Sequence, residues 1–155
     1  MPHWHYSYQV TPEEENRIVK ASLREVSISP KAAVEICREI KGMSLDEARG
    51  FLEEVVSKKK PVPFKRYVRK MGHRKQLEGW KIGRYPVKAA KYILQLLDNL
   101  ENNANERGLD LSRLKIIHAS TLRGRKVRKY IPRAFGRATP SFDVLTHVEI
   151  VAREE

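Results

Sequence analysis

Residues 114–153 read LKIIHASTLRGRKVRKYIPRAFGRATPSFDVLTHVEIVAR, and both ends of this stretch have the pattern of β-strands. The first end begins with Leu114, Ile116 and Ile117. At the second end, apolar and polar residues alternate, which is typical of a strand with one buried face. The side expected to be buried carries Phe142, Val144, Thr146, Val148 and Ile150, and the opposite side carries Asp143, His147, Glu149 and Arg153. We therefore expect an antiparallel sheet that is backed by helices on one face only.

Nineteen residues, 123–141, separate the two strands, far more than an ordinary hairpin turn contains. We expect the strands to continue outward as an extended hairpin arm. At about 3.3 Å per residue, half of this segment would reach about 30 Å beyond the body. An arm of this kind cannot bury its own side chains, so another molecule must hold it.

Three amphipathic helices are predicted upstream of this hairpin. Ser29 and Pro30 supply an N-cap and a first helical residue, and apolar residues at helical spacing continue to Gly42. Ser44 and Glu47 form a capping box for a second helix, which ends at the lysine run 58–60. A third and longer helix runs from Pro86 to the glycine at position 108.

The remaining segments complete a single domain over residues 1–155, the size expected from chain length. Residues 21–29 are predicted to form a strand and residues 1–20 an N-terminal tail. Residues 57–86, interrupted by proline and glycine, form a long basic loop. The fold class is α+β: a three-helix domain packed on a small antiparallel sheet, with a long extended β-hairpin arm whose tip is residues 123–141.

Positive charge is concentrated in two blocks of the sequence. Residues 57–91 contain thirteen Lys and Arg against one acid, Glu78, and residues 111–142 contain nine and no acid. The whole chain carries +12, so the remaining residues are net acidic. Aromatic residues are interleaved with the cations in both blocks, which favours RNA, because bases stack on flat faces while cations hold phosphates. The alternative is a solvated lysine-rich face, with aromatics such as Phe64 and Trp80 packed in the core.

Several other classes are disfavoured by the sequence. One cysteine, Cys37, cannot make an intramolecular disulfide, and it falls on the apolar face of the first helix. The basic blocks lack the converging carboxylates of metal-dependent nucleases, and no P-loop, dinucleotide or nucleophile motif is present. No apolar run approaches the ~20 residues of a spanning helix. We expect an intracellular, soluble, non-catalytic protein with no cofactor, metal site, membrane contact or small-molecule substrate.

Several motifs in one order resemble a known family. They are Ser29–Lys31, EICREIKG at 35–42, SLDEA at 44–48, and PRAFGRA at 132–138. Together they resemble large-subunit ribosomal protein twenty-two over nearly the whole chain, from Trp4 to Arg153. VPFKRYVRKMGHR at 62–74 and GWKIGRYPVKA at 79–89 resemble the archaeal and eukaryotic form of this family.

The resemblance implies a cytoplasmic structural protein of the large ribosomal subunit. Its body would lie near the peptide exit and its hairpin would line the nascent-polypeptide tunnel. The implied partners are 23S-type ribosomal RNA, neighbouring large-subunit proteins and the transient nascent chain. The residues expected to contact rRNA are Lys58, Lys59, Lys60, Lys65, Arg66, Arg69, Lys70, Arg74, Lys75, Arg84, Arg123, Arg125, Lys126, Arg128, Lys129, Arg133 and Arg137. The tip expected to line the tunnel comprises Tyr130, Ile131, Pro132, Arg133, Ala134, Phe135, Gly136 and Arg137.

Two other functions remain compatible with the residues alone. One is a free-standing regulator that binds duplex RNA or mRNA, and the other is a nuclease with an unfamiliar site. Sedimentation with large subunits distinguishes the first from a ribosomal protein, and incubation with RNA and magnesium tests the second.

Overall fold

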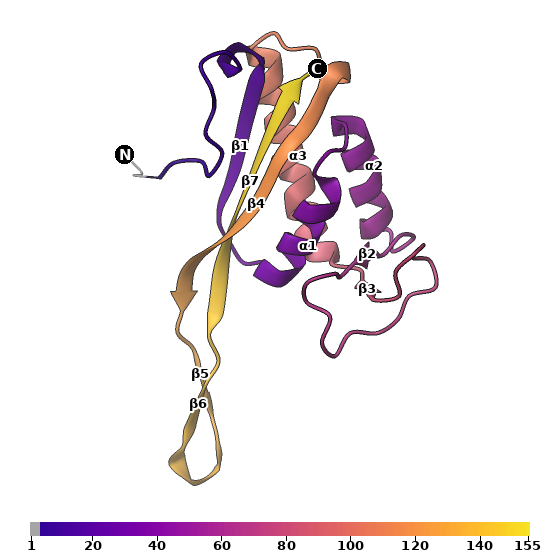
Figure 1. Ribbon diagram of the computed structural model, residues 1–155. Coiled ribbons are helices and arrows are strands. Elements are labelled where there is room, and N and C mark those ends of the chain that lie inside the picture. Colours follow the sequence, from indigo (N-terminus) through magenta and orange to yellow (C-terminus); the bar gives the residue numbers. More distant parts are fainter. Residues whose placement is uncertain (1–3) are drawn as a thin grey trace.

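The computed structural model describes residues 4–155 and places three helices against one face of a three-stranded antiparallel sheet (Figure 1). The sheet order is β1-β7-β4. Its strands are β1 (Ile18–Val26), β4 (Leu114–Val127) and β7 (Asp143–Glu154), and the helices are α1 (Pro30–Ile40), α2 (Leu45–Val56) and α3 (Val87–Glu106). Short strands pair as β2 (Val62–Pro63) with β3 (Gly83–Arg84) and as β5 (Tyr130–Pro132) with β6 (Ala138–Pro140). Single 3₁₀ turns occur at Glu15–Arg17, Leu111–Arg113 and Ala134–Gly136. The α+β prediction is confirmed.

The three helices follow the local signals in the sequence. The Ser29 hydroxyl accepts a hydrogen bond from the backbone N–H of Ala32, and Ser44 and Glu47 form a complete capping box. The third helix begins one residue later than expected, with Pro86 as its N-cap. All three helices bury one apolar stripe against the sheet and against each other.

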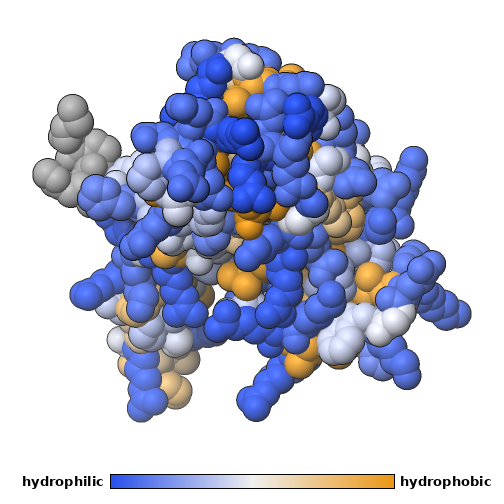
Figure 2. Space-filling view, turned by 45° about the horizontal axis from the view of Figure 1, so that its top comes forward, coloured by the Kyte–Doolittle hydropathy of each residue, from blue (hydrophilic) through white to orange (hydrophobic). Residues whose placement is uncertain are grey.

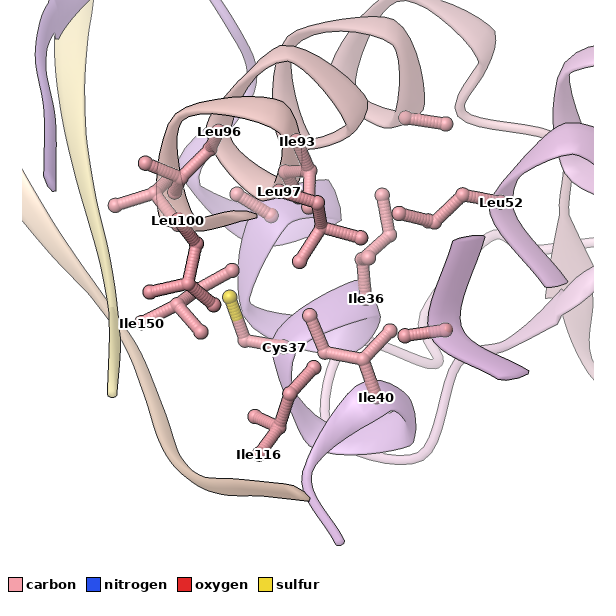
Figure 3. Packing of buried hydrophobic residues seen from close by; sticks show 14 of the residues in the cluster. Ile36, Cys37, Ile40, Leu52, Ile93, Leu96, Leu97, Leu100, Ile116 and Ile150 are labelled. Atoms are coloured by element: carbon pink, nitrogen blue, oxygen red, sulfur yellow. The ribbon is translucent and has the colours of Figure 1, made fainter. Parts of the chain in front are cut away.

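The core lies between the helices and the sheet (Figure 3). Ile36 and Ile40 of α1, Leu97 of α3 and Ile150 of β7 are all fully buried there. The Cys37 side chain points into the same cluster and is 3% exposed. Burial raises the pKa of this thiol to about 11, although Thr121 contributes an opposing hydrogen bond. Cys37 is therefore a core residue, as predicted.

The N-terminal part of the chain differs from the prediction. The first strand begins at Ile18 rather than at residue 21, because its pairing with β7 extends from Val26 back to Ile18, opposite Arg153. Both Ile18 and Val19 are buried. Residues 18–20 therefore belong to the sheet and not to a tail; residues 1–3 of the predicted tail lie outside the described residues.

The outer face of the sheet is covered around Glu149, so the prediction of a single buried face was wrong there. Glu149 is fully buried, and it accepts hydrogen bonds from the Ser7 backbone N–H at 2.9 Å, from the Ser7 hydroxyl, and from the Ser120 hydroxyl at 2.8 Å. The Arg24 guanidinium lies 3.8 Å from its other oxygen, beneath the ring of Trp4. Burial raises the pKa of Glu149, but the Ser7 and Ser120 hydrogen bonds outweigh it and hold the pKa below the usual range.

The segment between α2 and α3 is largely loop, as expected, but a two-residue ladder closes its ends. Val62 and Pro63 pair with Arg84 and Gly83. The Gly83 position is tight, since a Cβ there would lie 2.7 Å from the carbonyl oxygen of Val62. The loop therefore leaves and returns to the body at one point, beside the start of α3.

Candidate nucleic-acid interface

The hairpin arm projects away from the body, at the same end of the molecule as the basic loop (Figure 1). Strands β4 and β7 stay paired as far as Val127 and Asp143, and β5 and β6 continue the ladder toward the tip. Every residue from 128 to 142 is exposed. A two-stranded hairpin with no apolar face against the body is only marginally stable in water. The arm beyond Val127 therefore has no support from the body's core.

The predicted RNA-contacting cations are all exposed, and few are neutralised within the chain. Among residues 4–155, only three of these seventeen form ion pairs: Lys60 with Glu54 at 3.9 Å, Lys65 with Glu39 at 2.9 Å, and Lys129 with Asp143 at 3.8 Å. Hydrophilic side chains dominate the face shown in Figure 2, with separate apolar patches between them. Like charges crowded at one end of a domain repel one another, so this arrangement favours an external polyanion.

The tip of the arm is a tight turn formed by residues of the PRAFGRA motif. The Arg133 backbone N–H donates to the Arg137 carbonyl oxygen at 2.7 Å, which closes the turn. Phe135 and Gly136 have φ angles of +58° and +67°, in the left-handed region that glycine tolerates and phenylalanine rarely adopts. The Phe135 side chain is 98% exposed. The turn thus has an unfavourable backbone conformation at Phe135 and presents the uncovered ring of this residue between Arg133 and Arg137.

The base of the arm is fixed by a polar cluster that the sequence reasoning did not identify. The Glu25 backbone N–H donates to Nδ1 of His147 at 3.0 Å, and Nε2 of His147 lies 3.3 Å from the Glu25 carboxylate. The same carboxylate accepts from the Arg125 backbone N–H at 3.3 Å. Gly124 makes this approach possible, since a Cβ there would lie 2.8 Å from both Glu25 Oε1 and His147 Nε2. Glycine 124 therefore serves internal packing at the point where β4 leaves the body.

A buried carboxylate, Glu35, holds the start of the basic loop. Its Oε1 accepts from the backbone N–H groups of Arg66 and Tyr67 at 2.8 and 2.9 Å, and its Oε2 accepts from that of Lys65 at 3.2 Å. Glu35 is fully buried in α1. Sequence reasoning missed this role because the partners are backbone groups about thirty residues away, and no side-chain pattern marks them. The carboxylate positions two of the predicted RNA-contacting residues.

The aromatic residues of the basic loop divide into two groups. Phe64 is 3% exposed and belongs to the core, so for this residue the packing alternative is correct. Trp80 is 37% exposed, and its indole N–H donates to the Phe64 carbonyl oxygen at 3.0 Å. Tyr67 and Tyr85 are partly buried and lie beside cations, with the Arg74 guanidinium 5.5 Å from the Tyr85 ring centre. Trp80, Tyr67 and Tyr85 remain accessible to a ligand.

Two further classes of site are absent from the described part of the chain. No three His, Cys, Asp or Glu side chains among residues 4–155 are placed to hold a metal ion. No helix in this range has the length and apolar character needed to cross a membrane.

Comparison with known proteins agrees with this architecture. A family model described as "Ribosomal protein L22p/L17e" matches residues 21–153. The chain is 56% identical over 154 residues to the "Large ribosomal subunit protein uL22" of Thermofilum pendens, covering 99% of each chain. It is 53% identical over 152 residues to the protein of the same name from Archaeoglobus fulgidus, covering 98% of each, and 51% identical over 149 residues to that of Methanosphaera stadtmanae, covering 96% of each. The extended arm, the basic loop and these matches together lead to one conclusion: the chain belongs to the ribosomal protein L22p/L17e family.

Proposed function

We propose that this protein is a non-catalytic structural constituent of the large ribosomal subunit that binds large-subunit ribosomal RNA. The observation that carries the proposal is the arm: seven exposed Lys and Arg over residues 123–142, no acid among them, and one ion pair. Phosphates supply the missing negative charge, and release of their counterions supplies the binding free energy. Family membership and the names of the curated relatives support the same assignment.

The two basic blocks act together in this proposal. The basic loop and the arm lie at one end of the molecule, so RNA can contact both. The cations of the basic loop are Lys58, Lys59, Lys60, Lys65, Arg66, Arg69, Lys70, Arg74, Lys75 and Arg84, and those of the arm are Arg123, Arg125, Lys126, Arg128, Lys129, Arg133 and Arg137.

The finer placement follows from the family resemblance and from the shape of the arm. The body lies near the peptide exit, beside other large-subunit proteins, and the arm extends between RNA segments until its tip lines the nascent-polypeptide tunnel. Residues 130–137 form this tip, and a passing nascent chain is their transient partner. The fully exposed Phe135 and the closed turn beneath it support this role, because the turn leaves the ring uncovered and able to meet a passing chain.

Incorporation into large subunits tests the proposal. Arg133→Glu/Arg137→Glu changes the net charge by −4 at the arm, and the control Arg17→Glu/Lys41→Glu makes the same change at exposed residues outside both blocks. We expect the wild type and the control to sediment with large subunits and the arm variant to remain in the unbound fraction, with both variants folded. Equal incorporation of both variants, or a wild-type protein that stays in the unbound fraction, would contradict the proposal.

The alternative functions predict different results. A free-standing regulator would bind isolated RNA yet fail to sediment with subunits. A nuclease would shorten RNA in the presence of magnesium, whereas we expect the RNA to stay intact.

A further inference from the structure

A groove of about 740 Å³ lies between the two basic blocks, where the arm meets the body. Its walls come from residues 27–32 at the start of α1, from residues 84–89 at the start of α3, and from residues 142–144 at the base of the arm, with Phe64 and Met71 completing the lining. We name it the junction groove. Its volume is in the range of pockets that hold a small ligand, and its walls join the basic loop to the arm.

The junction groove has apolar and aromatic surface that the fold does not cover. Ile28 and Ala89 contribute buried side chains to its lining. Phe142 was expected on the buried face of β7, but it lies beyond the edge of the body and is 43% exposed. Its ring lies edge-on to Tyr130 at 6.0 Å, and the Lys126 ammonium lies over it at 5.5 Å. One wall is therefore an aromatic ring already placed beside a cation.

The charge around the groove is positive and largely uncompensated. Lys31, Arg84 and Lys88 are exposed and line it, and none forms an ion pair with a carboxylate among residues 4–155. The single acid in the lining, Asp143, already accepts a hydrogen bond from the Ser27 hydroxyl at 3.3 Å and lies 3.8 Å from Lys129. Lys31 and Lys88 also occupy the first turns of α1 and α3, where a positive charge is unfavourable unless an anion is near.

We propose that the junction groove receives one unpaired RNA nucleotide, with its base against Phe142 and the apolar floor and its flanking phosphates against Lys31, Arg84 and Lys88. This inference rests on the proposed rRNA binding and adds a site for a base to it. An apolar, aromatic wall bordered by cations matches a nucleotide, which carries a flat base and charged phosphates on either side. The groove is also continuous with both surfaces proposed to bind RNA.

The consequence is a fixed angle between the arm and the body. A nucleotide in this position touches α1, α3 and the first residues of β7 at once, so it connects the basic loop with the arm through one RNA strand. This contact would add to the Glu25–His147 cluster that already fixes the base of the arm.

Two RNA probes of equal charge test the inference with the full chain. One is a single-stranded twelve-nucleotide RNA of mixed sequence, and the other has the same backbone with every base removed. Because stacking of one base is worth a large factor in affinity, we expect the wild type to bind the base-bearing RNA about tenfold more tightly. Phe142→Ala should strongly reduce this preference without changing the salt dependence of binding, and Phe142→Tyr should retain it.

The control variant is Trp4→Ala, which removes an aromatic ring that is 36% exposed and lies outside the groove and outside both basic blocks. It should keep the preference, and thermal unfolding by circular dichroism should show that each variant is folded. If the wild type binds the two RNAs with equal affinity, the base site is contradicted but the proposed RNA binding is not. A preference that is unchanged in Phe142→Ala, or that is lost in Trp4→Ala, contradicts the location of the base site in the junction groove. Failure to bind either RNA contradicts the proposed function as well.

Discussion

Replacing Glu35 with alanine should detach the start of the basic loop from α1. The carboxylate is fully buried and accepts three backbone hydrogen bonds, at 2.8, 2.9 and 3.2 Å. A hydrogen bond to a charged group contributes about 1.5–3 kcal/mol. The released N–H groups can form hydrogen bonds with water when the loop opens. We therefore take the lower end of this range for each of the three hydrogen bonds and reduce their sum further. The free energy of unfolding should fall by about 3 kcal/mol.

Two further variants distinguish the stabilising effect of the buried carboxylate from that of a surface charge. Glu35→Gln keeps one oxygen as an acceptor but places an N–H₂ group against the remaining backbone donors, so it should lose about half as much as Glu35→Ala. The control is Glu39→Ala, a change in the same helix. The Glu39 carboxylate pairs with Lys65 at a partly exposed site. A surface ion pair of this kind contributes at most about 1 kcal/mol, so this variant should stay close to the wild type.

Urea unfolding and amide hydrogen exchange measure these effects. We expect the amides of residues 65–67 to exchange faster in Glu35→Ala and at the wild-type rate in Glu39→Ala, and RNA affinity to fall only in the former. If Glu35→Ala unfolds at the wild-type urea concentration, or if residues 65–67 keep their protection, the anchoring role of Glu35 is wrong.

Three further outcomes are expected from the fold. Gly124→Ala should lower the free energy of unfolding by about 1–3 kcal/mol, since the new Cβ would approach His147 Nε2 at 2.8 Å; wild-type stability in urea would contradict this. The raised pKa of Cys37, about 11, keeps its thiol neutral in the folded state, so stability should fall as pH rises between about 9 and 11, and a thiol reagent at pH 8 should modify only unfolded chains. The lowered pKa of Glu149 means that its contribution to stability is present above pH 4.5 and is lost as pH falls. The segment around Ser7 should therefore begin to leave the sheet below that pH, which the fluorescence of Trp4 would report. A segment that stays bound in acid would contradict the hydrogen bonding at Glu149.

Local signals account for the parts of the fold that sequence alone predicts. The caps at Ser29 and Ser44 and the apolar spacing of the helices act within one or two turns, so they can be read without tertiary contacts. The arm can also be predicted, because a long acid-free run between two predicted strands is not expected of an ordinary hairpin turn.

The parts that could not be predicted depend on distant segments. The burial of Glu149 is produced by Ser7, 142 positions away, and the N-terminal segment has no apolar periodicity that would place it on the sheet. Glu35 accepts hydrogen bonds from backbone N–H groups. Almost every residue has such a group, so the sequence does not indicate which ones Glu35 binds. Phe142 continues the alternation of β7, but the body ends before it. In each case the residue type is known from the sequence, but its burial and its contacts depend on segments that only the tertiary structure brings together.

Hydrogen exchange of the arm amides is the most direct test of the claim that RNA holds the arm in place. Residues 128–141 should exchange rapidly in the free protein, while β1 and α3 are protected, and they should become protected in reconstituted large subunits. Arm amides as slow as those of β1 in the free chain, or still unprotected within the subunit, would contradict the account.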